Sequence, residues 1–461
     1  MSRGGGLVRR FPVLAIRDFR ILLAERLIAP ASVGFSMVGV SFAVLNETGS
    51  SSDLSFVLAA QIAPALVFAL IGGVAADRFP AQRVILAANL IMAVGEGTFG
   101  LLVLTGRPPL WVMICLEALT GIGVALFYPA SQGLLPRLVP GDLLQEASAI
   151  SRMAMNTGMM SGAAVAGLLV AAAGPGWALA LCGVGMVSTV PMLLSIKGGR
   201  QRVRPDAGQA ADGAEPPAPS MVTELREGWA EFRSHTWLWV IVCQFCVVMM
   251  CWYGAFQVLG PVVAREHLGG PAAWGAITAA DSFGLIAGGL ISLRFTPRRP
   301  TRFVVLIGGA VAISPLSLAM VLPLPAVCVA SFALGVFIEM MMVQWTVTMA
   351  RNIAPDKLAR VSAYDVLGSV MAMPAGALIA GPLGAAIGIS SAQYAAAAVI
   401  IVASALALIP RDVRAMRSRD SARPQDEPLG HALEESVALG AVVPGVLHSE
   451  ALAAELEGAP R

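Results

Sequence analysis

The chain has few charged residues for its length. Only 13% of its 461 residues are Asp, Glu, Lys or Arg, whereas soluble domains contain roughly a quarter. So few charges cannot cover a water-exposed surface of this size, which excludes an ordinary soluble enzyme, a disordered chain and a disulfide scaffold. Apolar residues make up 57% of the chain and the mean hydropathy is +0.75. We therefore expect a protein whose surface is mostly in contact with lipid.

Residues that serve metal, redox or nucleotide chemistry are scarce and scattered. The six cysteines all lie in apolar runs, and Cys243 and Cys246 form a C-x-x-C pair without a second pair. No phosphate-binding loop of the G-x-x-x-x-G-K-S/T type occurs. A net charge of +2 gives no indication of nucleic acid. We predict no enzyme, no metal, no cofactor and no nucleic-acid partner. The four histidines are far apart, at His235, His267, His431 and His448.

Long apolar runs predict an all-α integral membrane protein with twelve transmembrane helices. A helix needs about 20 apolar residues to cross a hydrocarbon core of about 30 Å. A closed β-barrel is excluded because the runs are too long and do not alternate. The predicted spans are residues 20–45, 54–76, 84–105, 110–131, 146–172, 176–196, 237–260, 271–293, 302–322, 325–349, 360–387 and 390–410.

The positive charges predict the orientation of these spans. With the N-terminus in the cytoplasm, 28 of the 31 Lys and Arg residues fall on the cytoplasmic side, as the positive-inside rule requires. We expect a multi-pass protein of the cell membrane with both termini cytoplasmic. The expected parts are an N-terminal segment 1–19, a six-helix bundle 20–196, a linker 197–236, a second bundle 237–410 and a disordered tail 411–461.

Three sequence matches indicate that the two bundles are a parallel duplication. They occur in the same order in both halves, at offsets of 216, 215 and 214 residues. The pairs are Gly73–Phe79 with Gly289–Phe295, Pro140–Leu143 with Pro355–Leu358, and Gly162–Gly167 with Gly376–Gly381. In the linker, Glu224–Arg233 predicts an amphipathic helix on the inner membrane face.

Several motifs resemble those of the major facilitator superfamily over about residues 15–410. The strongest is Gly73-x-x-x-Asp77-Arg78-x-x-x-x-Arg83, between the second and third spans, where that superfamily carries its signature loop. Three stretches are similar to the branch of macrolide-efflux and enterobactin-exporter-like proteins. They are Phe127–Ala130 with Leu135-Pro136, Leu225–Trp229 and Ala359–Ser362.

The loop between the second and third spans is the candidate conformational latch. Asp77 can face the positive N-terminal end of the eleventh span in the other half, which would hold the halves closed on the inside. Arg78 and Arg83 can contact anionic headgroups. Alternatively, the loop only sets orientation. Pro80, and Ala81 with Gln82, replace the family's usual Gly and basic residues, so a latch here would be weaker.

Five carboxyl groups within the spans are candidates for proton coupling. A carboxylate at mid-membrane costs about 2.5–3.5 kcal/mol, so it needs a partner or a role. Glu339 is the first candidate because it is the deepest acid on a cavity-facing helix. Glu117 stands where many antiporters of the superfamily carry an Arg, and Glu96 and Asp281 could instead serve helix contacts. The five are Glu25, Glu96, Glu117, Asp281 and Glu339.

The resemblance implies a central cavity lined by spans one, four, seven and ten. Methionines there can equally be packing residues. The candidates that helical spacing groups on these spans are Ser32, Ser36, Thr120, Tyr128, Met250, Tyr253, Gln257, Met342 and Thr346. The partial antiporter hinge motif of the family supplies the hinge candidates Gly158, Gly162, Gly167, Gly376 and Gly381.

Together these features predict a secondary transporter that exports amphipathic small molecules by alternating access with proton antiport. Its partners would be a small-molecule substrate, protons and membrane lipid, and it would act as a monomer. The alternatives are uptake or facilitated transport of a specific metabolite, and a non-transporting sensor on a transporter fold.

Overall fold

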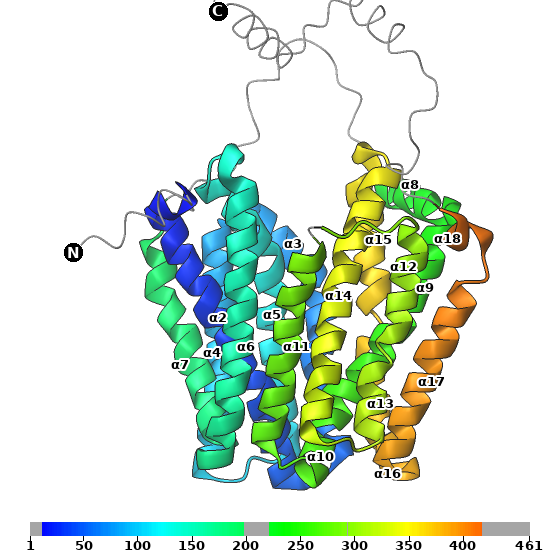
Figure 1. Ribbon diagram of the computed structural model, residues 1–461. Helices are drawn as coiled ribbons and strands as arrows, with labels where there is room; N and C mark the ends of the chain where they lie inside the picture. Colours follow the sequence, from blue (N-terminus) through cyan, green and yellow to red (C-terminus); the bar gives the residue numbers. More distant parts are fainter. Residues whose placement is uncertain (1–11, 198–220, 293, 417–461) are drawn as a thin grey trace, which may run out of the picture. The chain divides into compact units, whose positions relative to one another are not determined.

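The computed structural model describes residues 12–197, 221–292 and 294–416, which lie in one compact unit that ends at Met416 (Figure 1). The predicted N-terminal segment up to residue 11, the linker segment 198–220 and the tail from residue 417 lie outside the described residues. Every secondary-structure element within the described ranges is a helix. Twelve helical spans in these ranges are long and apolar enough to cross a membrane. The predicted fold class is confirmed.

Six uninterrupted helices form the first half of the chain. A short 3-10 helix, η1 (Pro12–Ala15), precedes them, and a second one, η2 (Gly141–Leu143), lies between the fourth and the fifth. Five of the six helices are longer than the predicted apolar runs, because neighbouring residues continue the helical backbone, and α7 has the predicted length. They are α2 (Arg17–Thr48), α3 (Ser51–Arg78), α4 (Ala81–Thr105), α5 (Leu110–Leu138), α6 (Leu144–Ala173) and α7 (Pro175–Ser195).

Three of the six spans in the second half are interrupted, which apolar run length did not predict. Each interruption ends two or three residues before a proline, namely Pro261, Pro315 or Pro374. The ring of a proline clashes with the carbonyl one turn earlier in a helix. The interrupted spans are α9 (Thr236–Trp252), η4 (Tyr253–Val258, a π-helix) and α10 (Leu259–His267); α12 (Pro300–Ala310) and α13 (Ile313–Ala319); and α15 (Pro355–Val370) and α16 (Met373–Ile387). The continuous spans are α11 (Pro271–Ser292), α14 (Leu324–Asn352) and α17 (Ile389–Ala407).

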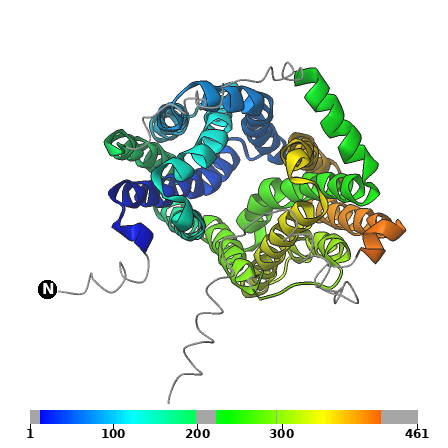
Figure 2. The ribbon, with the colours of Figure 1, turned by 90° about the horizontal axis from the view of Figure 1, so that it is seen from above.

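The helices pack as two groups that touch along a limited seam (Figure 2). In the first group α2 packs against α6 and α7, and α5 packs against α3 and α4. In the second group α14 packs against α11, α12 and α13. Between the groups, the extensive contacts are those of α6 with α11 and of α3 with α16.

The predicted amphipathic helix is present as α8 (Met221–Ser234), and it is docked on α15. Phe232 is buried, and the rings of Trp229 and Tyr364 lie 5.6 Å apart. Lys357 Nζ donates a hydrogen bond of 3.0 Å to Glu231 Oε2, and this bond holds the pKa of the Glu231 carboxyl group below its usual value. Helix α8 therefore connects the linker to the first part of the eleventh span.

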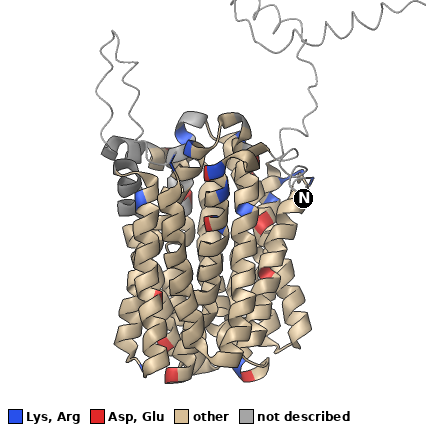
Figure 3. Cartoon of the chain, turned by 90° about the vertical axis from the view of Figure 1, so that its left-hand side faces the viewer, with Lys and Arg blue, Asp and Glu red and all other residues tan. Residues whose placement is uncertain are grey.

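Positive charge gathers at one end of the bundle, the end where η1 lies (Figure 3). The short helix α18 (Arg411–Ala415) lies at the same end. We call this the basic end. The opposite end, where Gly49 joins α2 to α3, is called the far end. The even number of spans brings both described ends of the chain to the basic end.

Candidate functional site

At the far end, apolar side chains of both halves share two core clusters. One joins Val44 and Leu54 of the first half to Val258 and Ala377 of the second. The other includes Phe42 and Ala166 together with Phe256 and Trp274. Close van der Waals packing of these side chains favours contact between the halves. These clusters close the seam at the far end.

Small residues let the backbones of the two halves approach within the same region. Gly381 N–H donates a hydrogen bond of 2.7 Å to Ser55 Oγ, and Ser51 Oγ donates one of 3.2 Å to Gly381 O. Gly167 lies against Gly275 so closely that a methyl group on either would overlap the other's backbone. Close contact of this kind holds α3 against α16 and α6 against α11.

A cavity of about 310 Å³, called cavity A here, lies inside the first half. Its walls come from α2 to α7, so every helix of this bundle contributes. Apolar and sulfur-containing side chains dominate these walls, including Met92, Met155, Met159 and Met186. The polar side chains on the walls are Ser36, Gln61, Glu96, Thr120 and Asn156.

Two carboxyl groups, Glu96 on the wall of cavity A and Glu117 behind the lining residue Gln61, have only neutral hydrogen-bond partners. Glu96 accepts a bond of 2.5 Å from Ser36 Oγ, and Glu117 accepts one of 2.9 Å from Gln61 Nε2. Both residues are almost fully buried and close enough to interact electrostatically. Within the described residues neither has an ion-pair partner, and Glu96 Oε2 and Glu117 Oε1 are buried without a hydrogen-bond partner. We call Glu96 and Glu117 the acid pair. Two like charges cannot both be accommodated here at low cost.

A second cavity, cavity B, of about 410 Å³, lies between α6 of the first half and α11 and α14 of the second. Asn156 lines both cavities, so they adjoin at this side chain. Glu339, Met342 and Thr346 line cavity B. Arg152 Nη1 lies 3.9 Å from Glu339 Oε1, with 73% of the Arg152 side chain exposed. This ion pair joins the two halves on the side of the cavities nearer the basic end.

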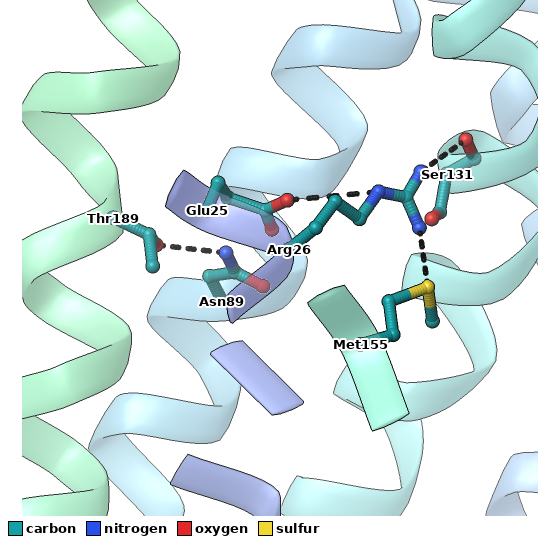
Figure 4. A network of polar contacts seen from close by, with 6 residues as sticks. All are labelled: Glu25, Arg26, Asn89, Ser131, Met155 and Thr189. Carbon is teal, nitrogen blue, oxygen red and sulfur yellow. Dashed lines mark hydrogen bonds and ion pairs between the residues drawn. The ribbon is translucent and has the colours of Figure 1, made fainter. Parts of the chain in front are cut away.

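Glu25 and Arg26 form a buried polar cluster beside cavity A (Figure 4). Arg26 Nε lies 3.9 Å from Glu25 Oε2, Nη2 donates a bond of 2.8 Å to Ser131 O, and Nη1 lies 3.4 Å from Met155 Sδ. Because Met155 also lines cavity A, the cluster adjoins the cavity on the side toward the basic end. Opposite charges in contact offset part of the cost of burial.

The other predicted cavity residues lie apart from these two cavities. Ser32 is buried, and its hydroxyl group donates to Ile28 O. Met250 lines a separate apolar cavity between α9, α16 and α17. Tyr253 packs against the far-end core cluster. Gln257 and Asp281 line neither cavity A nor cavity B. Asp281 Oδ1 is buried and has no hydrogen-bond partner in the described part of the chain.

Most of the predicted latch lies outside the residues whose side chains the structure describes. This holds for Gly73, Asp77 and Arg78 of the loop, and also for the cavity candidate Tyr128. The side chain of Arg83 is exposed at the start of α4. The latch therefore stays a prediction.

The hinge candidates are all points of close helix contact. Gly158 and Gly162 lie against the backbone carbonyls of Leu27 and Ala31 in α2. Gly376 lies against the carbonyl of Met250 in α9. Gly167 and Gly381 lie in the seam between the halves, as described above. A side chain at any of these positions would separate the two helices.

Three polar residues that the sequence did not single out line the cavities in the structure. They are Gln61, Arg152 and Asn156. Arg152, Asn156 and Met159 are spaced i, i+4 and i+7, so helical periodicity indicated a common face of α6. From the sequence alone, Arg152 contributes only to the positive charge of the cytoplasmic side.

Comparison with known proteins agrees with this architecture. Residues 27–364 match the Major Facilitator Superfamily. Macrolide efflux protein A of Streptococcus pyogenes is 23% identical over 81% of this chain and 90% of its own length. Enterobactin exporter EntS of Escherichia coli O1:K1 / APEC is 25% identical over 87% of this chain and 93% of its own.

Among solved structures, a bacterial homolog of the human lysosomal transporter Spinster, crystallised inward-facing and unoccupied, shares the fold. Its TM-score is 0.65 at 17% identity, over 86% of this chain and 97% of that one. The helices described above therefore have the arrangement of a known transporter.

Proposed function

The chain belongs to the major facilitator superfamily, and we propose that it exports amphipathic small molecules across the cell membrane in exchange for protons. The acid pair, Glu96 and Glu117, carries this proposal. A carboxylate buried within a membrane costs about 2.5–3.5 kcal/mol, and no described cation offsets that cost here. The pair can therefore hold a proton when cavity A is closed to water and release it when the cavity opens.

The lining of the cavities supports an amphipathic cargo. Four methionines give cavity A a surface that adapts to irregular apolar shapes. The acids at both cavities favour a cargo that also carries a positive charge or hydrogen-bond donors. Two relatives of this chain have names that describe efflux or export, which supports export over uptake.

The position of the charges supports a cytoplasmic basic end. With this orientation both termini are cytoplasmic, and the closed far end faces outward. The cavities then lie on the cytoplasmic side of the closed seam, where an exporter takes up its cargo. Because both halves of the path come from one chain, we propose that the monomer is the transporting unit.

Transport into proteoliposomes with an imposed pH gradient tests the proposal, with a panel of dyes, macrolides and siderophores as cargo. We expect wild-type protein to move at least one cargo against its gradient when the opposite side is acidic. Glu96→Gln and Glu117→Gln should each reduce gradient-driven transport by at least about tenfold, because an amide cannot release a proton. Binding of a neutral cargo should persist.

Glu47→Gln is the matched control. Glu47 is a carboxyl group of the same six-helix bundle, near the end of α2. It pairs with Arg107 at 3.7 Å near the far end and lines neither cavity A nor cavity B. Its replacement should leave transport unchanged. Uptake of a single solute would overturn the proposed direction. Binding without flux in wild-type protein would instead indicate a sensor.

A further inference from the structure

A second concentration of charge lies at the basic end of the second half, apart from cavities A and B. Four arginines line one open depression of about 460 Å³, together with Leu408 and Ala415. Arg299 and Arg302 come from the beginning of α12, and Arg411 and Arg414 come from α18. We call this depression the arginine pocket. Residues more than 100 positions apart in the sequence thus converge on one place.

The backbone under the arginine pocket is fixed. Thr301 Oγ1 donates a hydrogen bond of 2.8 Å to Val413 O, which ties α12 to α18. The Val413 side chain is fully buried in a core cluster that also contains Trp237 and Val304. Arg414 Nη2 donates a bond of 3.1 Å to Ile409 O. The segments that carry the two pairs of arginines are therefore held next to each other.

In the described part of the chain, no acidic side chain pairs with the arginines of the pocket. None of the four guanidinium groups forms an ion pair with a carboxylate in the described residues, and no acidic side chain lines the pocket. Asp412, on α18 between two of the arginines, is exposed and does not line the pocket. Like charges gathered in this way repel one another, so an anion would relieve that repulsion.

The position of the pocket favours a lipid. Leu408 follows the last residue of α17, where the twelfth span ends. Leu406 and Ile409 are 58% and 64% exposed, which places apolar surface directly beside the arginines. A molecule with an anionic head and apolar chains can contact both surfaces at once. Basic pockets between helices on the cytoplasmic side are suited to such headgroups.

We infer that Arg299, Arg302, Arg411 and Arg414 form a binding site for a phosphate group, supplied by the headgroup of an anionic phospholipid. A guanidinium group presents two parallel N–H donors that match two phosphate oxygens. Four such groups can surround one headgroup, and the apolar rim can hold the beginning of its acyl chains. Free phosphate from the cytoplasm is the other source of the same chemistry.

The test uses full-length protein in nanodiscs of phosphatidylcholine with increasing phosphatidylglycerol, with bound lipid counted by native mass spectrometry. Arg411→Gln/Arg414→Gln should weaken phosphatidylglycerol binding at least about tenfold, because charge-assisted bonds are lost. The matched control is Arg17→Gln/Arg20→Gln. It removes the same amount of charge from two exposed residues at the start of α2, which lies at the basic end as well. This control should retain binding.

Arg411→Lys/Arg414→Lys keeps the charge and so separates binding from misfolding. It should bind phosphatidylglycerol more weakly than wild type and more tightly than the Gln variant, because an ammonium group makes no bidentate contact. Equal losses in the Gln variant and in the Arg17/Arg20 control would show only diffuse attraction and overturn the site.

Inorganic phosphate added to detergent-solubilised protein distinguishes the two sources. If the lipid is the source, millimolar phosphate should leave the bound phosphatidylglycerol in place and should not raise the unfolding temperature. If phosphate displaces the lipid and stabilises wild type but not the Gln variant, the lipid assignment is wrong. Neither outcome depends on the export proposal, because the arginine pocket is separate from cavities A and B.

Discussion

The carboxyl groups within the helices differ in what surrounds them. Glu96 and Glu117 have neutral partners, whereas Glu25 and Glu339 each have an arginine 3.9 Å away. An acid without a cation avoids the cost of buried charge by holding a proton. An acid beside an arginine can remain ionised until another cation replaces that arginine. The two groups therefore suit different steps of transport.

Arg152 should compete with cationic cargo for Glu339. We expect Arg152→Gln to bind a lipophilic cation such as tetraphenylphosphonium about three- to tenfold more tightly, because Glu339 loses its internal partner. Arg152→Lys retains the charge and should bind like wild type. Binding of a neutral macrolide, measured by calorimetry on the same samples, should not change. An equal change for both cargoes would contradict the competition.

Helices in this protein pack at distances that only glycine permits. A methyl group on Gly162 would overlap the carbonyl of Ala31, whereas Gly133 in α5 has open space within 4 Å. The Gly-rich character of the fifth span is thus a packing requirement for α2 against α6. Sequence periodicity shows the glycines, but not which helix each one meets.

Gly162→Val should destabilise the protein by about 1–3 kcal/mol through overpacking. Thermal unfolding in detergent measures the effect as a lower midpoint temperature. Gly133→Ala is the control and should leave the midpoint unchanged or raise it slightly, because Ala favours the helix and nothing obstructs it. A stable Gly162→Val variant with normal transport would show that α2 and α6 can separate freely.

Helix α8 should undock from α15 in acid. The hydrogen bond from Lys357 lowers the pKa of Glu231. The contribution of this bond to the docking of α8 is therefore fully present above the ordinary glutamate pKa of about 4.3. That contribution is lost as the pH falls through the lowered value, since the neutral acid binds Lys357 less strongly. Hydrogen exchange of α8 peptides, corrected for intrinsic rates, should rise there.

Lys357→Gln is the control for this pH effect. At neutral pH the variant should already show the faster exchange of α8, and acid should add little. If wild type and variant respond equally to pH, the Glu231 contact does not hold α8 in place. Docking would then rest on the ring contacts of Trp229 and Phe232 with Tyr364.

At the scale of the whole molecule, the described conformation is closed at the far end, and the Arg152–Glu339 pair joins the two halves nearer the basic end. Alternating access requires the far-end contacts of α3 with α16 to break. The hydrogen bonds of Gly381 with Ser51 and Ser55 lie in that contact.

A bulky side chain in this contact should shift the conformational equilibrium toward an open far end. Gly381→Val would overlap the backbone carbonyl of Ser51. In a background without the six native cysteines, Leu54→Cys is a reporter because Leu54 is fully buried in the closed far end. Its reaction with a maleimide should be at least about threefold faster when Gly381→Val is also present. Gly133→Ala is the control and should leave the rate unchanged, because nothing lies within 4 Å of that position. Equal rates in all three proteins would show that this contact does not hold the far end closed.

Hydropathy and charge by themselves determined the twelve spans, because lipid requires long apolar helices whatever their neighbours are. The internal matches and the signature loop likewise indicated the family. Tertiary structure alone decided which acids share a cavity with which partners. The sequence does not distinguish Glu96 from Asp281, yet packing brings Glu96 to Ser36 and cavity A. Pairing of this kind depends on the rotation of each helix about its axis, and that rotation is set by contacts with helices distant in the sequence.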